Sequence, residues 1–377
     1  MKKIKVIHLI TGLDIGGAET MLYKLVSSTD NAIFHLKVIS LTDIGPVGKK
    51  INELGIPVIS LGMKNGVPNP IFLFKLIRIL RREKPDLLQT WMYHSDLIGF
   101  IAGKIAKVSK IVWGIRHSNL NLDENKKSTI LIAKVCSKLS KYVDSIICCS
   151  KASVESHQEI GYDKNKMIIL PNGFNLDEFR PDIHAKSRLV DLLKVNQDDF
   201  LIGMVGRWDP LKDHQNFILT AEKISKKVNN VKFILCGNGV TKENELLVSW
   251  IEDAGISNKT FLLGRREDIS KIMPGLDLLI SSSSGEGFPN VIGEAMACEV
   301  PCVVTDVGDS AYIVGDTGLV VQPKDSNALA NASLQLIESS LGELGYKARE
   351  RIIKNFELNI VTQKFEEAYL TLIKKQI

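Results

Sequence analysis

The stretch LDLLISSSSGEGFPNVIGEAMA, residues 276–297, contains the signals of a strand, a loop and a helix in succession. The apolar run at 276–281 has the length of a buried strand, and the Ser-Gly-Glu-Gly cluster that follows is typical of a loop. Pro289 fits the first turn of a helix, where a missing N–H does no harm. Glu286 then lies in the loop, and Glu294 lies about one turn inside the helix.

Short apolar runs alternate with helical patterns along almost the whole chain, which predicts parallel sheets covered by helices on both faces. The expected strands are 4–10, 36–41, 58–61, 87–91, 111–115, 145–149, 167–170, 200–206, 231–236, 260–263, 276–281, 301–305 and 318–321. A chain of 377 residues usually forms two domains. We therefore expect an α/β protein with two Rossmann-like, doubly wound domains facing a cleft. The expected domains are 1–180 and 181–355, followed by a helix at 356–377 that suits packing on the first domain.

The composition is that of an ordinary globular protein, with 45% apolar and 24% charged residues. The six cysteines have neither metal-site nor disulfide spacing, which favours buried free thiols in a reducing compartment. The N-terminal MKKIKVIHLI indicates a first strand rather than a signal peptide. Because no apolar window has the length of a membrane span, we expect a cytoplasmic protein.

The positive charge is concentrated in the first half of the chain. Residues 1–180 contain 26 Lys and Arg against 16 Asp and Glu, whereas residues 181–377 contain 22 against 27. A strongly apolar helix expected at 70–84 carries Lys75, Arg78, Arg81 and Arg82. It fits either an anionic membrane surface or a core helix with a solvated basic edge. Nucleic acid is disfavoured, because no aromatic and basic motif accompanies the charge.

Candidate phosphate-binding residues follow the strand that ends at Val205. In GRWDPLKDH, Arg207 and Lys212 project from the loop at the carboxyl end of that strand, where two cations suit a diphosphate. Solvated surface charge is the alternative for this loop taken alone. The pair of glutamates on a neighbouring strand of the same domain favours the binding site.

Three further features of the sequence indicate which ligands and cofactors the protein can bind. Gly16 and Gly17 precede a helix near Glu19, where a ligand can approach the backbone, but the dinucleotide fingerprint and the P-loop are both missing. His94 and His117 each follow an expected strand and can donate to a sugar hydroxyl or a phosphate; a histidine satisfied within its loop is the alternative. No two aspartates are separated by a single residue, so the paired carboxylates that hold a divalent cation at a diphosphate are missing, and we expect no metal and no other cofactor.

The segment GEGFPNVIGEAMACEVPCVVTDVGD resembles the donor-binding segment of the retaining glycosyltransferases of family 4, which have the two-domain GT-B fold. GLDIGGAE, GIRHS, PNGFN, GRWDPLKDH and CGNG resemble further motifs of the family, so that the resemblance covers nearly the whole chain. It implies that a sugar is transferred from a nucleotide-diphosphate donor, expected to be a UDP-sugar, to a glycan or lipid-linked acceptor. The product would belong to surface polysaccharide or lipopolysaccharide.

The resemblance also implies roles for individual residues: Glu286 would bind the donor sugar, and Glu294 the ribose hydroxyls. The implied catalytic residues are Glu286, His117, Arg207 and Lys212. The implied donor-binding residues are Gly16, Gly17, Arg207, Lys212, Gly237, Arg265, Glu286, Gly287, Phe288, Pro289, Asn290, Val291 and Glu294. The implied acceptor-side residues are His94, Arg116 and Asn172.

The sequence departs from the family pattern at two places. Pro289–Asn290 stands where many members have Gly-Leu, and Glu299 stands where a glycine is common. Two other functions remain open: a sugar-nucleotide epimerase of the same architecture, and a catalytically silent sugar-nucleotide-binding subunit. The intact set of charged residues at 207, 212, 286 and 294 argues against the silent subunit.

Overall fold

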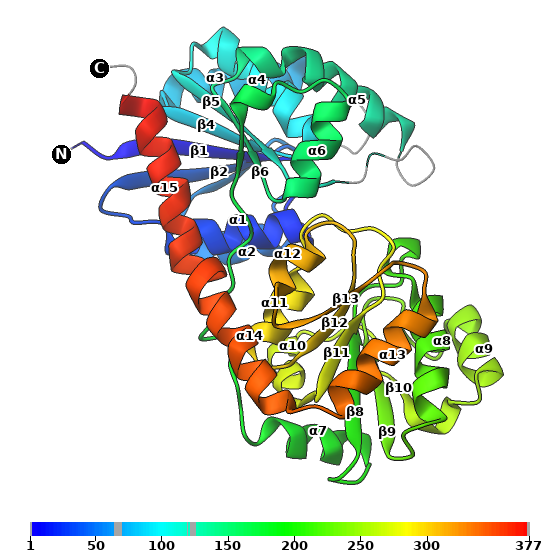
Figure 1. Cartoon of the computed structure of the whole chain (residues 1–377). Coiled ribbons are helices and arrows are strands. Elements are labelled where there is room, and N and C mark those ends of the chain that lie inside the picture. Colours follow the sequence, from blue (N-terminus) through cyan, green and yellow to red (C-terminus); the bar gives the residue numbers. More distant parts are fainter. Residues whose placement is uncertain (1, 64–69, 119, 121–125, 375–377) are drawn as a thin grey trace. The chain divides into compact units, whose positions relative to one another are not determined.

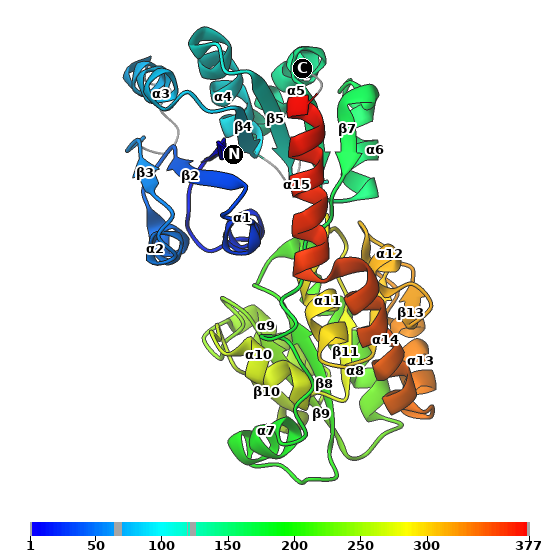
Figure 2. The same cartoon turned by 90° about the vertical axis from the view of Figure 1, so that its left-hand side faces the viewer.

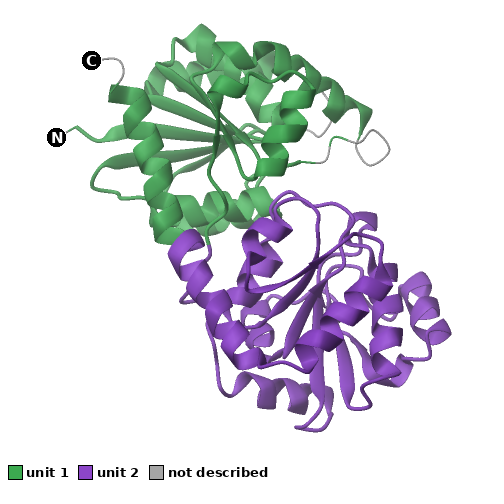
Figure 3. Cartoon of the chain, in the orientation of Figure 1, with its two compact units in different colours: residues 1–173, 358–377 green, residues 174–357 purple. Residues whose placement is uncertain are grey.

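The computed structural model describes residues 2–63, 70–118, 120 and 126–374. The chain forms two compact units (Figure 3), one made of Met1–Gly173 with Leu358–Ile377 and the other of Phe174–Glu357. The domain boundary was predicted at 180, and the first unit ends at Gly173. Phe174 belongs to the second unit because its ring stacks on Phe288 and its N–H donates to the carbonyl of Phe356.

Unit 1 is a parallel sheet with helices on both faces (Figure 1). Its strands are β1 (Ile4–Ile10), β2 (Phe34–Ser40), β3 (Val58–Ser60), β4 (Leu87–Trp91), β5 (Lys110–Ile115), β6 (Ser145–Cys148) and β7 (Met167–Ile169). Its helices are α1 (Gly17–Ser28), α2 (Gly45–Glu53), α3 (Pro70–Glu83), α4 (Tyr93–Ala106), α5 (Lys127–Leu139), α6 (Lys151–Glu159) and α15 (Leu358–Lys374), with short turns η1 (Ser140–Tyr142) and η2 (Lys164–Lys166). The strand order is β3-β2-β1-β4-β5-β6-β7.

Unit 2 repeats this plan with the strand order β10-β9-β8-β11-β12-β13. Its strands are β8 (Phe200–Val205), β9 (Val231–Cys236), β10 (Thr260–Leu262), β11 (Leu278–Ser281), β12 (Cys302–Thr305) and β13 (Gly318–Val321). Its helices are α7 (Ala185–Leu193), α8 (His214–Ser225), α9 (Glu245–Asp253), α10 (Ile269–Ile272), α11 (Asn290–Ala297), α12 (Ser310–Val314), α13 (Ser326–Ile337) and α14 (Leu341–Phe356), with turns η3 (Pro210–Lys212), η4 (Ser257–Lys259) and η5 (Met273–Gly275).

The predicted doubly wound α/β fold is therefore confirmed, and each predicted strand is present with its ends shifted by at most two residues. The strands are nearly continuous apolar runs because both faces of each sheet are covered by helices. In unit 1, α1, α2 and α15 pack on one face of the sheet, and α3 and α4 pack on the other. In unit 2, α8, α9 and α13 share a core with the strands.

The last two helices belong to different units. Helix α14 lies in unit 2, and α15, separated from it by Glu357, lies in unit 1 (Figure 2). Val361, Phe365 and Tyr369 of α15 are buried in the core that also contains residues of α1. The six cysteines are buried free thiols, as the sequence predicted.

Candidate functional site

The strand order places the two most informative motifs side by side. Strand β8 is followed in the chain by β9 on one side of it, whereas β11, its other neighbour, is followed by β12 on the opposite side. In a parallel sheet, the loops diverge at such a point and leave a crevice at the carboxyl ends of the strands. In unit 2 the loop that carries Arg207 and Lys212 and the loop that carries Glu286 meet at this point, with a void of about 10 Å³ between them.

Lys212 and Glu286 form an ion pair across these two loops. The Lys212 Nζ lies 2.5 Å from the Glu286 Oε1, with the side chains 20% and 11% exposed. The hydroxyl of Ser283 donates to the same oxygen over 2.7 Å. The structure thus brings together two of the residues predicted for the donor site and adds Ser283, which the sequence did not indicate.

Hydrogen bonds between the two loops hold the Lys212–Glu286 pair in place. The N–H of Ser284 donates to the carbonyl of Leu211 over 2.8 Å. The hydroxyl of Ser282 reaches the carbonyls of Lys212 and Asp213 at 3.1 and 3.0 Å. Asp213 has a left-handed backbone with φ +49°, and its side chain accepts the Asn216 N–H at the start of α8. The loop that carries Lys212 is therefore held at several points.

Arg207 lies on the same loop but in different surroundings. Its side chain is 66% exposed and donates to Asp209 through Nε at 2.9 Å and Nη2 at 2.6 Å. Burial by itself would raise the pKa of Asp209, but hydrogen bonds from the Leu211 N–H and from Arg207 hold that pKa below its ordinary value. The predicted cation pair is thus divided, with Lys212 on a glutamate and Arg207 on an aspartate.

Gly237 brings the neighbouring loops to the same edge of the sheet. A Cβ at this position would lie 1.9 Å from the carbonyl oxygen of Gly206, so only glycine fits. Its N–H donates to the carbonyl of Gly264 over 2.8 Å, and the next residue, Arg265, is exposed. Arg265 also lines an open cavity of about 530 Å³ beside the bidentate pair of Arg266 and Asp268. Gly237 and Arg265 therefore lie on loops that follow β9 and β10, next to the loop after β8.

The segment from Gly287 to Glu294 differs from the prediction in one detail. Pro289 does not lie in the first turn of α11: it is the N-cap residue, with φ −74° and ψ 101°, and the helix begins at Asn290. An N-cap residue keeps non-helical dihedral angles, and the extended ψ of Pro289 lets the loop turn into α11. The ring of Phe288 is buried and stacks on Phe174 at 6.2 Å. Val291 and Glu294 are half-buried residues of α11.

Three further residues, at the end of β12 and in the turn after it, support this loop and were missed from the sequence. The hydroxyl of Thr305, at the end of β12, donates to the carbonyl of Ser283 over 2.6 Å. Gly308 has φ +56°, and a Cβ there would lie 2.4 Å from the carbonyl oxygen of Glu286. The N–H of Asp309 donates to the carbonyl of Gly287 over 3.0 Å. The glycine in the Val-Gly-Asp stretch after β12 was the available signal, since glycine after a strand indicates a turn.

The matching edge of unit 1, where β1 and β4 end side by side, contains a cavity of about 690 Å³. Its lining comes from the loops after β1, β2, β3 and β4 and from the first turns of α1, α4 and α5: Thr11, Gly12, Asp14, Glu19, Thr42, Asp43, Gly62, Met63, Met92, Tyr93, His94 and Thr129. The predicted acceptor-side residue His94 is in this lining, and burial, with a smaller effect of Lys126, lowers its pKa. Gly16 is the N-cap of α1 and Gly17 its first residue, just beyond the loop that lines the cavity.

Arg116 and Asn172, also predicted for the acceptor side, are in contact. The Nη1 of Arg116 donates to Asn172 Oδ1 over 3.1 Å. The guanidinium lies over the rings of Trp91 and Phe365, at 4.6 and 5.4 Å from their centroids, and burial lowers its pKa. Arg116 therefore packs within unit 1, between β4 and α15. His117, the next residue, is half-buried.

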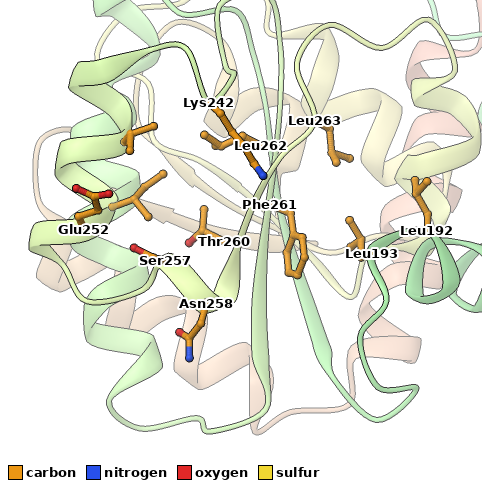
Figure 4. Close-up of a pocket in the computed structure, with 12 residues that line it drawn as sticks. Leu192, Leu193, Lys242, Glu252, Ser257, Asn258, Thr260, Phe261, Leu262 and Leu263 are labelled. Atoms are coloured by element: carbon orange, nitrogen blue, oxygen red, sulfur yellow. The ribbon is translucent and has the colours of Figure 1, made fainter.

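A second cavity in unit 2, of about 630 Å³, lies along the edge strand β10 (Figure 4). Apolar side chains such as Leu193, Phe261 and Leu262 contribute to its lining, together with Lys242 and Glu252. None of its lining residues belongs to the loops after β8 and β11, so we do not assign it to the candidate site.

Neither a membrane-spanning helix nor a metal cluster is found in the part of the chain that the structure describes. None of its helices combines the length and the apolar character needed to cross a bilayer. No group of three or more His, Cys, Asp and Glu side chains there could hold a metal ion.

Comparison with known proteins gives two family matches in succession. The Glycosyltransferase Family 4 model matches residues 15–178, and the Glycosyl transferases group 1 model matches residues 199–339. Together they cover most of the chain.

Similar proteins of bacteria agree with these matches. The chain is 25% identical over 308 residues to the Escherichia coli UDP-Gal:alpha-D-GlcNAc-diphosphoundecaprenol alpha-1,3-galactosyltransferase, covering 80% of this chain and 79% of that protein. It is 24% identical over 350 residues to the Campylobacter jejuni N,N'-diacetylbacillosaminyl-diphospho-undecaprenol alpha-1,3-N-acetylgalactosaminyltransferase, covering 86% and 89%. The crystal structure of Anabaena HepE in complex with UDP matches with a TM-score of 0.86 at 22% identity, over 98% of this chain and 100% of that one. The chain therefore belongs to the family 4 glycosyltransferases and has their fold of two Rossmann-like domains.

Proposed function

We propose that this glycosyltransferase moves a hexosyl group from a UDP-sugar to a glycan or lipid-linked acceptor, with retention of the anomeric configuration and without a metal ion. The observation that carries the proposal is the Lys212–Glu286 pair, at the point where the loops after β8 and β11 meet. It sets a cation suited to a phosphate beside a carboxylate suited to sugar hydroxyls. The names of the Escherichia coli relative and of the Anabaena structure, which mention UDP-Gal and UDP, support a UDP-sugar.

In the proposed mechanism, the donor's diphosphate is bound by Arg207 and Lys212. Each cation has to exchange part of its bond to a carboxylate, Asp209 or Glu286, for a bond to a phosphate oxygen. Glu286 accepts from the hydroxyls of the transferred sugar, and Glu294 accepts from the ribose. Hydrogen bonds to ionised groups contribute about 1.5–3 kcal/mol each, enough to orient the donor.

The chemical step breaks the bond between the anomeric carbon and the diphosphate oxygen through an oxocarbenium-like state. The electron pair of that bond leaves with the diphosphate, whose growing charge Arg207 and Lys212 stabilise without a metal ion. The acceptor hydroxyl attacks the same face of the sugar, and its proton passes to the leaving phosphate oxygen. The family resemblance assigns His117 to the transferred sugar. Retention then needs no separate catalytic base.

The acceptor binds at the carboxyl edge of unit 1. The cavity that contains His94 is large enough for a sugar, and Asp14, Glu19 and Asp43 offer acceptors for sugar hydroxyls. The Escherichia coli and Campylobacter jejuni relatives are named for acceptors linked through diphosphate to undecaprenol. Those names support a lipid-linked acceptor and a role in surface polysaccharide synthesis.

Unit 1 also has a face suited to a membrane surface. Helix α3 buries Leu76 and Leu80 against the sheet, so the core interpretation of this helix holds. On its outer side, however, Ile71 and Phe74 are 67% and 69% exposed beside the basic residues of the same helix. Exposed apolar and basic side chains on one helix are typical of a peripheral membrane contact. We therefore extend the proposal to peripheral binding at an anionic bilayer.

The donor is tested by thermal unfolding with UDP, GDP, ADP, CMP and NAD, first with EDTA and then with magnesium. A ligand at 100 times its dissociation constant stabilises a fold by about 2.7 kcal/mol. We expect a shift with UDP that persists in EDTA. A shift that requires magnesium contradicts metal independence, and a shift with NAD alone contradicts the transferase.

The membrane contact is tested by sedimentation with phosphatidylglycerol vesicles and with phosphatidylcholine vesicles. We expect the double variant Phe74→Glu, Arg78→Glu to lose binding to the anionic vesicles. The matched control, Leu246→Glu, alters an exposed apolar residue of unit 2 and is expected to sediment like the wild type. Equal sedimentation of all three proteins would contradict the contact.

A further inference from the structure

The serine run after β11 makes a different bond at each position. Ser282 ties its hydroxyl to the carbonyls of Lys212 and Asp213, and Ser284 ties its N–H to the carbonyl of Leu211. Ser283, between them, directs its hydroxyl to the Glu286 carboxylate instead. Two of the three consecutive serines therefore attach this loop to the loop after β8. The third contacts Glu286, the side chain proposed to bind the sugar.

The position of Ser283 is closely determined. Its side chain and backbone are 2% exposed. Its carbonyl accepts the hydroxyl of Thr305 at 2.6 Å, and Thr305 is itself fully buried at the end of β12. The hydroxyl of Ser283 thus starts from a backbone that is fixed by the next strand of the sheet.

The Glu286 backbone is fixed from a second direction. Its carbonyl oxygen approaches Gly308 so closely that a Cβ there would lie at 2.4 Å. The next residue, Gly287, accepts the N–H of Asp309 at 3.0 Å. With the backbone held in this way, the position of the carboxylate depends on the groups that bond it, among them Lys212 and Ser283.

Lys212 and Ser283, the two hydrogen-bond donors to Glu286, respond differently when a nucleotide sugar binds. Lys212 carries the charge that a diphosphate attracts, so its bond to Glu286 weakens when the phosphates arrive. Ser283 is neutral and part of the same loop as Glu286, so it keeps its bond to Oε1. An O–H donor to a carboxylate at 2.7 Å is a short, charge-assisted hydrogen bond.

We propose that Ser283 is a positioning residue, which holds the carboxylate of Glu286 in place for the hydroxyls of the transferred sugar while Lys212 turns to the diphosphate. The inference rests on the proposed function. It concerns recognition of the sugar and not of the nucleotide, because the nucleotide is assigned to Arg207, Lys212 and Glu294.

The test compares the affinities of Ser283→Ala for UDP and for a UDP-sugar by titration calorimetry. The sugar nucleotide is the one among UDP-glucose, UDP-galactose, UDP-GlcNAc and UDP-GalNAc that binds the wild type most tightly. We expect affinity for the UDP-sugar to fall about tenfold, as for the loss of one hydrogen bond to a charged group. Affinity for UDP should stay within twofold of the wild type.

Three further variants separate positioning from a general loss of structure. Ser283→Thr keeps the hydroxyl and should restore the affinity for the UDP-sugar, and Ser283→Cys, with its weaker donor, should give an intermediate value. Ser333→Ala removes an equally buried hydroxyl that donates over 2.7 Å to the Leu329 carbonyl in α13, and it should change neither affinity.

The outcomes distinguish the inference from the function on which it rests. If the wild type binds both ligands and Ser283→Ala binds the UDP-sugar equally well, the inference is overturned and the proposed function stands. An equal loss for UDP and UDP-sugar also overturns it, because Ser283 would then act on the whole loop. If the wild type binds none of the UDP-sugars, both proposals are overturned.

Discussion

The two units share a strand order around their first strands, yet the edges at which β1 meets β4 and β8 meets β11 are built differently. In unit 2 the loops after β8 and β11 are joined by the Lys212–Glu286 pair and by bonds from Ser282 and Ser284. In unit 1 the corresponding loops surround a cavity of about 690 Å³. The strand order diverges at the same point in both units, and the residues of the loops decide how open each edge is.

The difference fits a division of labour between the two ligands of a transferase. A diphosphate carries charge that nearby cations stabilise, and the bond to Glu286 holds Lys212 close to the proposed phosphate site before the donor arrives. A glycan has many hydroxyl groups, and in the proposed function the carboxylates of Asp14, Glu19 and Asp43 in the unit 1 cavity accept hydrogen bonds from them. We can test this difference by removing the contacts that join the loops after β8 and β11, which we call the closed edge of unit 2.

The largest effect is expected from Lys212→Ala, which removes the ion pair that closes the unit 2 edge. The proposed diphosphate site loses a cation, and the Glu286 carboxylate loses its charged partner. We expect kcat/KM for the UDP-sugar to fall about 10³-fold, or roughly 4 kcal/mol. Steady-state kinetics with a lipid-linked or glycan acceptor measure it.

The control for this variant is Lys186→Ala, which removes a 2.8 Å ion pair with Asp277 elsewhere in unit 2. It should leave kcat/KM within about threefold of the wild type, since this half-buried pair joins α7 to the start of β11, away from the loops after β8 and β11. Similar losses in both variants would mean that any broken ion pair in the unit impairs turnover, and the edge would lose its special role.

Gly308→Ala tests whether the closed edge depends on the turn after β12. The new Cβ meets the carbonyl of Glu286 at 2.4 Å and the residue has φ +56°. We expect the free energy of unfolding to fall by about 2–3 kcal/mol, because a close-packed backbone cannot move away without cost.

The matched variant is Gly255→Ala, which has φ +66° and no atom within 4 Å of its Cβ. It carries the backbone strain alone and should cost about 1 kcal/mol. Urea denaturation of both variants isolates the contact with Glu286. Equal losses would show that the turn after β12 does not support the donor loop.

The sequence predicted the strands well because each is an apolar run bounded by loop residues, a local signal. It also named Lys212 and Glu286 as candidate site residues. It could not show that they pair, because the contact depends on β8 and β11 being neighbours. Thr305 was missed for the same reason: its bond to Ser283 exists only because β12 lies beside β11. Pro289 was placed one position too far into the helix because the entry direction of the loop is set by tertiary packing.

The comparison between the units extends to histidines in their interiors. In unit 1, burial lowers the pKa of His8 to about 3 and that of His157 to about 4; in unit 2, burial lowers the pKa of His214 to about 4. The ordinary value is 6.5, so protonation favours the unfolded chain. The contribution of the neutral histidines to the free energy of unfolding is complete above about pH 6.5. It is lost as the pH falls toward the pKa values that the histidines have in the folded protein.

His8→Asn isolates one of these contributions. The Nδ1 of His8 accepts the indole N–H of Trp91 at 3.3 Å, and an asparagine oxygen can accept it instead. Between pH 7 and pH 5 we expect the variant to lose about 1–2 kcal/mol less stability than the wild type in urea denaturation. His35→Asn, at an exposed position of β2, should keep the wild-type loss. An unchanged loss in His8→Asn would contradict a neutral buried histidine.

The smallest effect concerns the helices that follow β4 and β11, which both end near a left-handed residue other than glycine. Lys107 has φ +59° at the end of α4, and Glu299 has φ +62° just after α11. Glycine removes the steric strain of the left-handed backbone but increases the entropy of the unfolded chain. The charges shift this balance in opposite directions, since a helix C-terminus favours a cation and disfavours an anion by about 0.3–1 kcal/mol. We therefore expect Glu299→Gly to raise the free energy of unfolding by about 1 kcal/mol and Lys107→Gly to leave it almost unchanged, as measured by urea denaturation at low ionic strength.

If salt abolishes the difference between the two variants, the helix dipole is its cause. A difference that persists in 1 M salt would assign it to contacts of the Glu299 side chain instead.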